Sequence, residues 1–209
     1  MTSPDRFAAI RNLQMRYDPE PFHSDQVAKL AMQLFDELLT LHKLSASGRT
    51  LLEAAALLHD IGYAWQNEAG HHKNSLKLIL ENHLPDFSPT ETGIIANVAR
   101  YHRKSLPSEN HRQYAALPPD ATAIVRKLAA LLRIADGLDR SHRSLVYEIK
   151  TVIEPRKVIF KIYHYGELRN EIAAAEKKAD LFENEFGCQA VFHSNYINGS
   201  ETLTGKNKS

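Results

Sequence analysis

Apolar residues recur at helical spacing through the first two thirds of the chain. Between residues 24 and 42 they stand three or four positions apart, as on one face of a helix. They are Val27, Leu30, Ala31, Leu34, Phe35, Leu38 and Leu39. After a break at 45–48, the run LLEAAALLHDI predicts a second helix from about Thr50, and Gly62 is a typical stop.

Three more helices are predicted downstream. One begins near His71 and ends before Pro85. Ser88 with Glu91 forms a capping box, with proline at the first helical position, so the next helix should run to about His102.

A long, strongly apolar helix is predicted after a loop over 107–119. Asp120 is the candidate N-cap of this helix, because a short acidic side chain can accept a hydrogen bond from the first turn. The helix should end near Asp139.

The pattern then changes to an alternation typical of strands. Residues 145–153 and 157–165 are predicted to form two strands, followed by a helix over 167–186 closed by Gly187 and a third strand at 189–193. The fold class is therefore mainly α. The expected parts are a helical domain of residues 1–142, a small ββαβ (α+β) unit of residues 143–195 and a disordered tail of residues 196–209.

Composition narrows the class of protein. The 209 residues are 43% hydrophobic and 24% charged, as in one globular domain with a small appendage. A single cysteine, Cys188, excludes an internal disulfide framework and fits a reducing compartment. The net charge of +1 argues against DNA as a partner. We read no signal peptide and no apolar run of about 20 residues, so a cytoplasmic location without membrane contact is expected.

Eleven histidines direct attention to metal chemistry. Histidine and aspartate side chains from separate segments can hold one or two divalent ions, which activate water for attack on phosphorus. The candidate metal ligands are His23, His59, Asp60, His71 or its neighbour His72, His102 and Asp136.

Two of these positions have informative surroundings. His59 and Asp60 close an apolar helix, where two consecutive side chains can most readily face one metal. Asp136 lies in the apolar stretch LAALLRIADGLD, where a buried carboxylate is costly unless it is paired or bound to a metal.

Each candidate also has a structural reading. His23 could be exposed at a helix start, His59 a satisfied core histidine and Asp60 a helix-end hydrogen-bonding group. His71 and His72 could lie on the surface, His102 could belong to the basic strip RYHRK, and Asp136 could only pair with an arginine. The basic residues that could contact a phosphorylated substrate, or be solvated surface, are Arg103, Lys104, Arg133 and Arg140.

The order of the histidines and aspartates resembles the HD superfamily of metal-dependent phosphohydrolases. The resemblance implies that the first histidine, the His-Asp pair and the last aspartate hold one metal, with Asp60 bridging, and that His71 and His102 complete a second. Ser75 after the third histidine favours His71 over His72. Many active members carry lysine where this chain has Tyr63, so an expected charge near the phosphoryl group is missing.

A closer resemblance extends from about Pro21 to His193. The stretches LHDIGY, HHKNS, LPDFSPTE, VARYHRKSLP, LRIADGLDRSH and AEKKADLFENEFG are similar to the C-terminal half of the exopolyphosphatase/guanosine-pentaphosphate phosphatase family. That similarity implies an all-helical HD domain followed by a small α/β domain. The family's exopolyphosphatase chemistry resides in actin-like domains with glycine-rich phosphate loops. None of the nine glycines forms such a loop, so this mechanism is not expected of these residues.

Two functions from different classes follow. The first is an HD-type phosphohydrolase acting on a nucleotide or other phosphorylated small molecule, with His59 and Asp60 at the catalytic centre and one or two Mn, Fe, Co, Ni, Zn or Mg ions as cofactors. The alternative is a non-catalytic regulatory module that binds polyphosphate or a nucleotide alarmone and mediates dimerisation, with a homodimer as a possible assembly.

Overall fold

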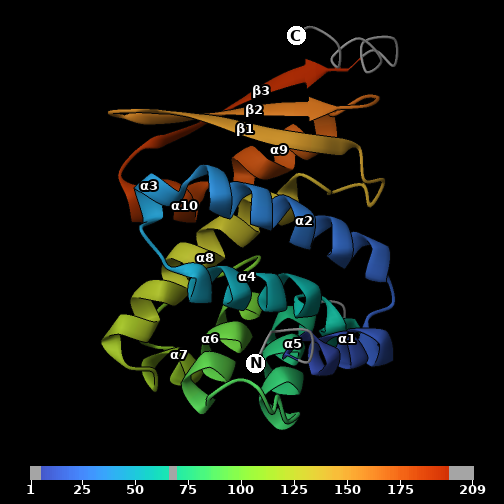
Figure 1. The fold of residues 1–209 in the computed structure, drawn as a ribbon, viewed down its shortest axis with the longest axis vertical. Helices are drawn as coiled ribbons and strands as arrows, with labels where there is room; N and C mark the ends of the chain where they lie inside the picture. Colours follow the sequence, from blue (N-terminus) through green and yellow to red (C-terminus); the bar gives the residue numbers. More distant parts are fainter. Residues whose placement is uncertain (1–5, 66–69, 198–209) are drawn as a thin grey trace, which may run out of the picture.

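The computed structural model describes residues 6–65 and 70–197. Its helical part comprises α1 Arg6–Tyr17, α2 Pro21–Glu37, α3 Leu39–His42, α4 Ala46–Leu58, the 3₁₀ helix η1 Ile61–Trp65, α5 His71–Glu81, α6 Pro89–Arg100, α7 Arg112–Ala115 and α8 Pro119–Gly137. The remaining elements are β1 Val146–Glu154, β2 Lys157–His164, α9 Arg169–Lys178, α10 Asp180–Phe186 and β3 Gln189–Tyr196. The predicted class, mainly α with a small α/β unit, is confirmed (Figure 1).

Helix α8 is the centre of the helical part. Its second half, from Leu128 to Gly137, is buried at every position, as expected for a helix that is apolar on all sides. It packs against α2, α4 and α6 and, on another side, against α9 and α10. Any polar side chain on this half of α8 therefore needs a partner inside the molecule, and Arg133 and Asp136 are such side chains.

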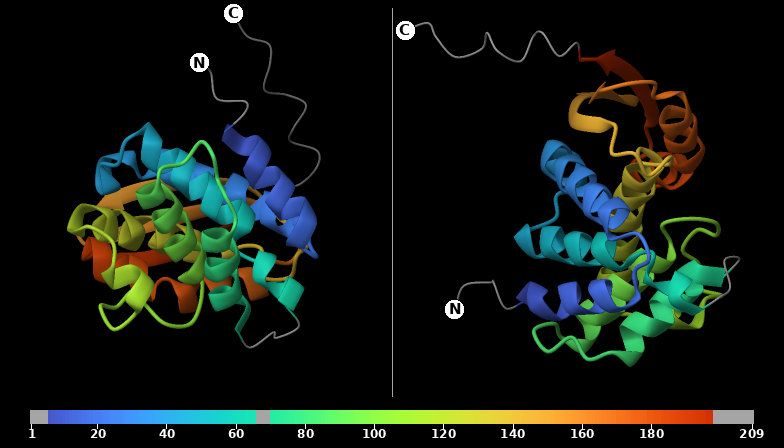
Figure 2. Two further views of the ribbon diagram at one scale, coloured as in Figure 1. Left: turned by 90° about the horizontal axis from the view of Figure 1, so that it is seen from below. Right: turned by 90° about the vertical axis from the view of Figure 1, so that its right-hand side faces the viewer.

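The sheet covers one end of the molecule (Figures 1 and 2). Strands β1 and β2 pair antiparallel, and β2 and β3 pair parallel through the α9–α10 crossover. Alternate side chains of β2, such as Val158, Phe160 and Ile162, are buried, which places one face of the sheet against the helices. Helix α2 also supplies polar side chains to the edge strand: the Gln26 amide donates to the Val146 carbonyl at 2.6 Å.

Several predicted boundaries are wrong. Helix α2 begins earlier, at Pro21, and the helix expected to reach residue 42 is interrupted at Leu38. The predicted break at 45–48 is shorter than expected, because α4 already starts at Ala46. Asp120 is not the N-cap of α8: Pro118 occupies that position, and Asp120 lies in the first turn.

Two further expectations need correction. The expected loop at 107–119 contains the short helix α7. The helix expected over 167–186 consists of two helices that meet at Ala179, so the unit is ββααβ. The stop at Gly187 is confirmed, since this residue adopts a left-handed φ of 64°.

Some of the sequence lies outside the described residues, including most of the predicted tail. Within the described part, no helix combines the length and apolarity needed to cross a membrane. Cys188 is buried and not bonded to another cysteine.

Candidate metal centre

The His-Asp pair lies where α4 ends and η1 begins. The Ser75 hydroxyl of α5 donates to the His59 carbonyl at 2.6 Å, and Gly62 N–H donates to the same Ser75 oxygen at 3.0 Å. A Cβ at position 62 would lie 2.0 Å from the His71 carbonyl oxygen. The glycine is therefore required for the close approach of α5, which brings His71 to the pair, rather than only as a helix stop.

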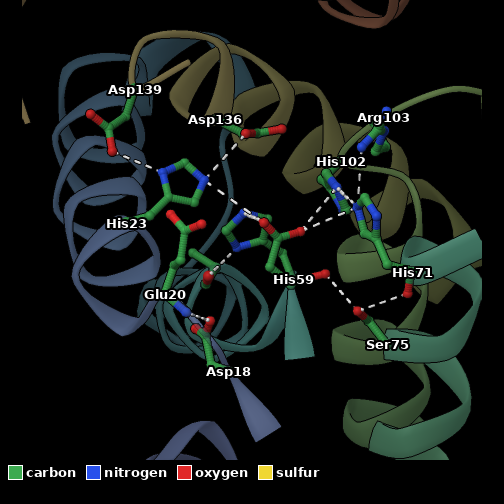
Figure 3. A network of polar contacts seen from close by, with 12 residues as sticks. Asp18, Glu20, His23, His59, His71, Ser75, His102, Arg103, Asp136 and Asp139 are labelled. Atoms are coloured by element: carbon green, nitrogen blue, oxygen red, sulfur yellow. Dashed lines mark hydrogen bonds and ion pairs between the residues drawn. The ribbon is translucent and has the colours of Figure 1, made fainter. Parts of the chain in front are cut away.

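Two groups of buried ligand-type atoms lie side by side. His23, His59 and Asp136 form the first group, and their ligand atoms lie within 4.8 Å of one another. His23 comes from α2 and Asp136 from α8, and the His23 Nε2 to Asp136 Oδ1 distance is 3.6 Å. Thus three separate helical segments converge on one point (Figure 3).

Asp60, His71 and His102 form the second group. Asp60 faces both groups, since its Oδ2 lies 3.5 Å from His59 Nε2 and its Oδ1 lies 3.3 Å from His71 Nε2 and 3.5 Å from His102 Nε2. This carboxylate therefore lies between the two groups.

The backbone determines which ring nitrogen faces the centre. His59 Nδ1–H donates to the Ala56 carbonyl at 2.7 Å, and His102 Nδ1–H donates to the Ala99 carbonyl at 2.6 Å. A carbonyl can only accept, so in each neutral ring the lone pair is on Nε2, which points into the centre. Burial holds the pKa of His102 well below its ordinary value and keeps the ring neutral.

His23 is oriented by a carboxylate. Its Nδ1–H donates to Asp139 Oδ2 at 2.8 Å (Figure 3). Burial opposes a charged ring, but the flanking carboxylates Asp136 and Asp139 outweigh burial and raise the pKa of His23 to about 10. A metal ligand must be deprotonated at the coordinating atom, so an ion bound at His23 would displace a proton.

The fit to a metal ion rests on buried atoms without hydrogen bonds. Within the described ranges, His23 Nε2, His59 Nε2 and Asp60 Oδ1 are buried and make none. A buried polar atom that makes no hydrogen bond costs about 1–3 kcal/mol. Imidazole nitrogens with carboxylate oxygens suit transition metals such as Mn, Fe, Co, Ni or Zn. The residues present therefore fit one ion at each group.

His72 and Tyr63 lie beside the second group. His72 belongs to neither group, and burial with the charge of His71 lowers the pKa of His72 to about 4. The Tyr63 ring stacks on His71 with ring centroids 3.8 Å apart. Burial and the charge of Asp60 raise the pKa of Tyr63, so its phenol stays neutral in the position where the HD resemblance expects a lysine.

A cavity of about 430 Å³ opens over both groups. Three of the predicted substrate-binding residues, Arg103, Lys104 and Arg140, line it. Arg133 also lines it, but its guanidinium donates to the Tyr101 carbonyl, the Lys178 carbonyl and the Asp180 carboxylate. Its donors are thus directed at protein acceptors.

Sequence reasoning missed three groups at this centre. Asp139 follows Asp136 by three positions in the same apolar stretch, a spacing that could have suggested a shared site. The His142 ring stacks on His23 with centroids 3.8 Å apart and pairs with Glu20. Lys178 of α9 pairs with Asp136, whereas the sequence had suggested an arginine partner. Nothing in the sequence around Lys178 connects this residue to the centre.

Taken together, a helical bundle with two buried His/Asp groups under a basic cavity defines a protein that could hold metal ions and receive an anionic ligand. The chain belongs to the Ppx/GppA phosphatase family: the model described as Ppx/GppA phosphatase, domain III, matches residues 6–170. The relation to the exopolyphosphatase/guanosine-pentaphosphate phosphatase family expected from the sequence is thereby confirmed.

Proposed function

We propose that this protein is an HD-type, metal-dependent phosphohydrolase acting on a nucleotide or another phosphorylated small molecule. The observation that carries the proposal is the pair of His/Asp groups sharing Asp60, in which three buried ligand-type atoms make no hydrogen bond. Membership of a phosphatase family and the basic cavity support the same chemistry.

The residues divide into two ligand sets. His23, His59 and Asp136 would hold one divalent ion, and His71 and His102 a second, with Asp60 contacting both. When bound, such ions lower the pKa of water and withdraw charge from a phosphoryl oxygen.

The surrounding protein groups orient the ligands and the substrate. The Asp139 carboxylate and the Ala56 and Ala99 carbonyls fix the rings of the three histidines that they contact. Arg103 and Lys104 would bind phosphate oxygens, Arg103 in a bidentate manner and Lys104 as a compact charge.

The division into a helical domain of residues 1–142 and a unit of residues 143–195, a homodimeric assembly and a cytoplasmic location belong to the same proposal. The helical domain provides the six ligand residues of the two groups.

A second candidate is a non-catalytic module that binds polyphosphate or a nucleotide alarmone. The Lys178–Asp136 ion pair favours it, because a lysine ammonium already balances one carboxylate of the first group. In that case the cavity would bind anions without needing a metal.

The test begins with metal content. Protein purified without chelators should contain at least one divalent ion per chain by elemental analysis and should hydrolyse a member of a phosphomonoester and phosphodiester panel. Asp60→Asn should lose both properties, and Asp120→Asn, at an exposed position of α8, should keep them. The non-catalytic module would be favoured if the wild-type protein binds phosphorylated ligands but contains no metal and hydrolyses none of them.

A further inference from the structure

The last residue of α9 reaches the metal centre from the α/β unit. The Lys178 ammonium donates to Asp136 Oδ2, and both side chains line the cavity. The side chains are 20% and 12% exposed, so this lysine lies at the boundary between the buried ligands and the open cavity.

The backbone around Lys178 is firmly held. Arg133 Nε–H donates to the Lys178 carbonyl at 3.2 Å, and a terminal nitrogen of Arg133 donates to Asp180 Oδ1 at 2.8 Å. At the end of α8, a Cβ on Gly137 would lie 2.7 Å from the Cα of Ala175. The absence of a side chain at position 137 thus lets α9 lie directly on α8, and Arg133 ties the α9–α10 junction to it.

The ammonium has capacity beyond the observed ion pair. A lysine ammonium has three N–H donors. Across the part of the chain that the structure describes, Lys178 donates to Asp136 alone. The neighbouring cations Lys177, Arg140 and Arg103 line the same cavity, so an anion there meets positive charge from α9 and from the segments that follow α8 and α6.

We propose that Lys178 is a phosphate-binding residue of this site, contributed by the α/β unit and positioned by Arg133 and Gly137. This inference rests on the proposed function and extends it. The phosphoryl group bound over the His/Asp groups accepts hydrogen bonds from the Lys178 donors that Asp136 leaves available. Arg133, expected from the sequence to contact substrate, acts instead through Lys178.

Inorganic phosphate is the probe for the test. It is titrated by calorimetry into full-length protein, once metal-free and once loaded with Mn²⁺, and bound metal is measured on the same samples. Lys178→Ala should weaken phosphate binding about 10-fold or more, as expected for lost hydrogen bonds from a charged donor. Lys178→Arg should retain most of the affinity because it keeps the charge. Lys157→Ala, at the start of β2 and outside the cavity lining, is the matched control and should bind as wild type.

Lys178→Gln, which preserves the stem, is measured alongside in case the alanine variant does not fold. Wild-type phosphate affinity in either folded variant, with or without a rise in metal affinity, would reduce Lys178 to a counter-ion of Asp136 and overturn the inference. Failure of the wild type to bind phosphate would also overturn it. If phosphate binding depends on Lys178 but the wild type hydrolyses nothing, the proposed function fails and the inference stands.

Discussion

Two buried histidines at helix ends, His42 and His59, show what distinguishes a core histidine from a ligand histidine. Both side chains are fully buried. His42 Nε2–H donates to the Phe35 carbonyl at 2.8 Å, and its Nδ1 accepts from Leu44 N–H at 2.9 Å. His59 Nδ1–H donates to Ala56, but its Nε2 has no hydrogen bond.

Burial alone would therefore have classed these residues together. The difference lies in the second ring nitrogen. In His42 this nitrogen accepts a hydrogen bond from Leu44 N–H, whereas in His59 it faces carboxylates and makes no hydrogen bond. His23 resembles His59: its Nδ1–H donates to Asp139, and its Nε2 makes no hydrogen bond. A histidine with one nitrogen held and the other directed at carboxylates has the properties of a metal ligand.

The largest effect is expected from replacing the two histidines in parallel. His59→Asn can keep a donor for the Ala56 carbonyl but lacks the Nε2 atom, so metal at the first group and hydrolysis should fall to background. His42→Gln can keep the donor to Phe35 and should retain full metal content. Elemental analysis of both purified variants checks the comparison, and equal metal content in the two would remove His59 from the ligand set.

A smaller effect is expected one step away from the ligands. Asp139→Asn leaves His23 in place but weakens the carboxylate–imidazole bond at Nδ1. Loss of such a contact typically lowers metal affinity about 10- to 100-fold. Competition with a chelator measures this affinity, with Asp120→Asn as the matched control. An unchanged affinity would show that the His23 ring is oriented by its other neighbours, including the stacked His142.

Replacing the basic residues that line the cavity should have a smaller effect than the changes at His59 and Asp139. Arg103 lines the cavity and its guanidinium lies 3.3 Å from His71 Nε2. Arg103→Ala and Lys104→Ala should each weaken binding of a phosphorylated ligand by a few-fold while leaving metal content intact. The loss should shrink with added salt where the contact is exposed. Wild-type affinity in both variants would mean that RYHRK is only a solvated helix end.

The sequence predicted the candidate ligand residues better than the residues that pair with them. Histidine and aspartate are chemically distinctive, and Asp136 stood out because its stretch is otherwise apolar. Lys178 could not be found in this way, because it is 42 residues from Asp136 in a charged run that reads as surface. Only the packing of α9 on α8, through Gly137, brings the two together.

Helix ends, too, could be predicted where the signal is local and not where packing decides. The capping box of α6 was predicted because it is local: Ser88 Oγ accepts from Glu91 N–H, and Glu91 accepts from Ser88 N–H. Helix α1 was not anticipated, since it buries only three side chains and is defined by its contacts with α4 and η1. At the start of α8, consecutive prolines outweighed the preference of Asp120 for the N-cap position.

The smallest effect concerns stability and sharpens the role of His42. Burial, with the charge of Lys127, lowers the pKa of His42 despite its hydrogen bond to the Phe35 carbonyl. Protonation would place an N–H on Nδ1 against the N–H of Leu44, which is a like-for-like clash of donors. The neutral ring is therefore the form that the fold requires.

Because the folded-state pKa lies below the ordinary value of 6.5, the unfolded chain binds the extra proton first as pH falls. The contribution of His42 is complete above that value and is lost progressively as pH falls below it toward the folded-state pKa. His42→Gln cannot titrate, so its deficit in unfolding free energy relative to wild type should shrink as pH falls from 7.5 to 5.5. Urea unfolding of both proteins with chelator present measures this, and the chelator removes any difference in bound metal.

His72 and His102, whose pKa values are also lowered, are common to both proteins and cancel in the difference. Parallel stability curves across this range would show that the neutral ring of His42 makes no pH-dependent contribution, and would remove the energetic basis for separating it from His59.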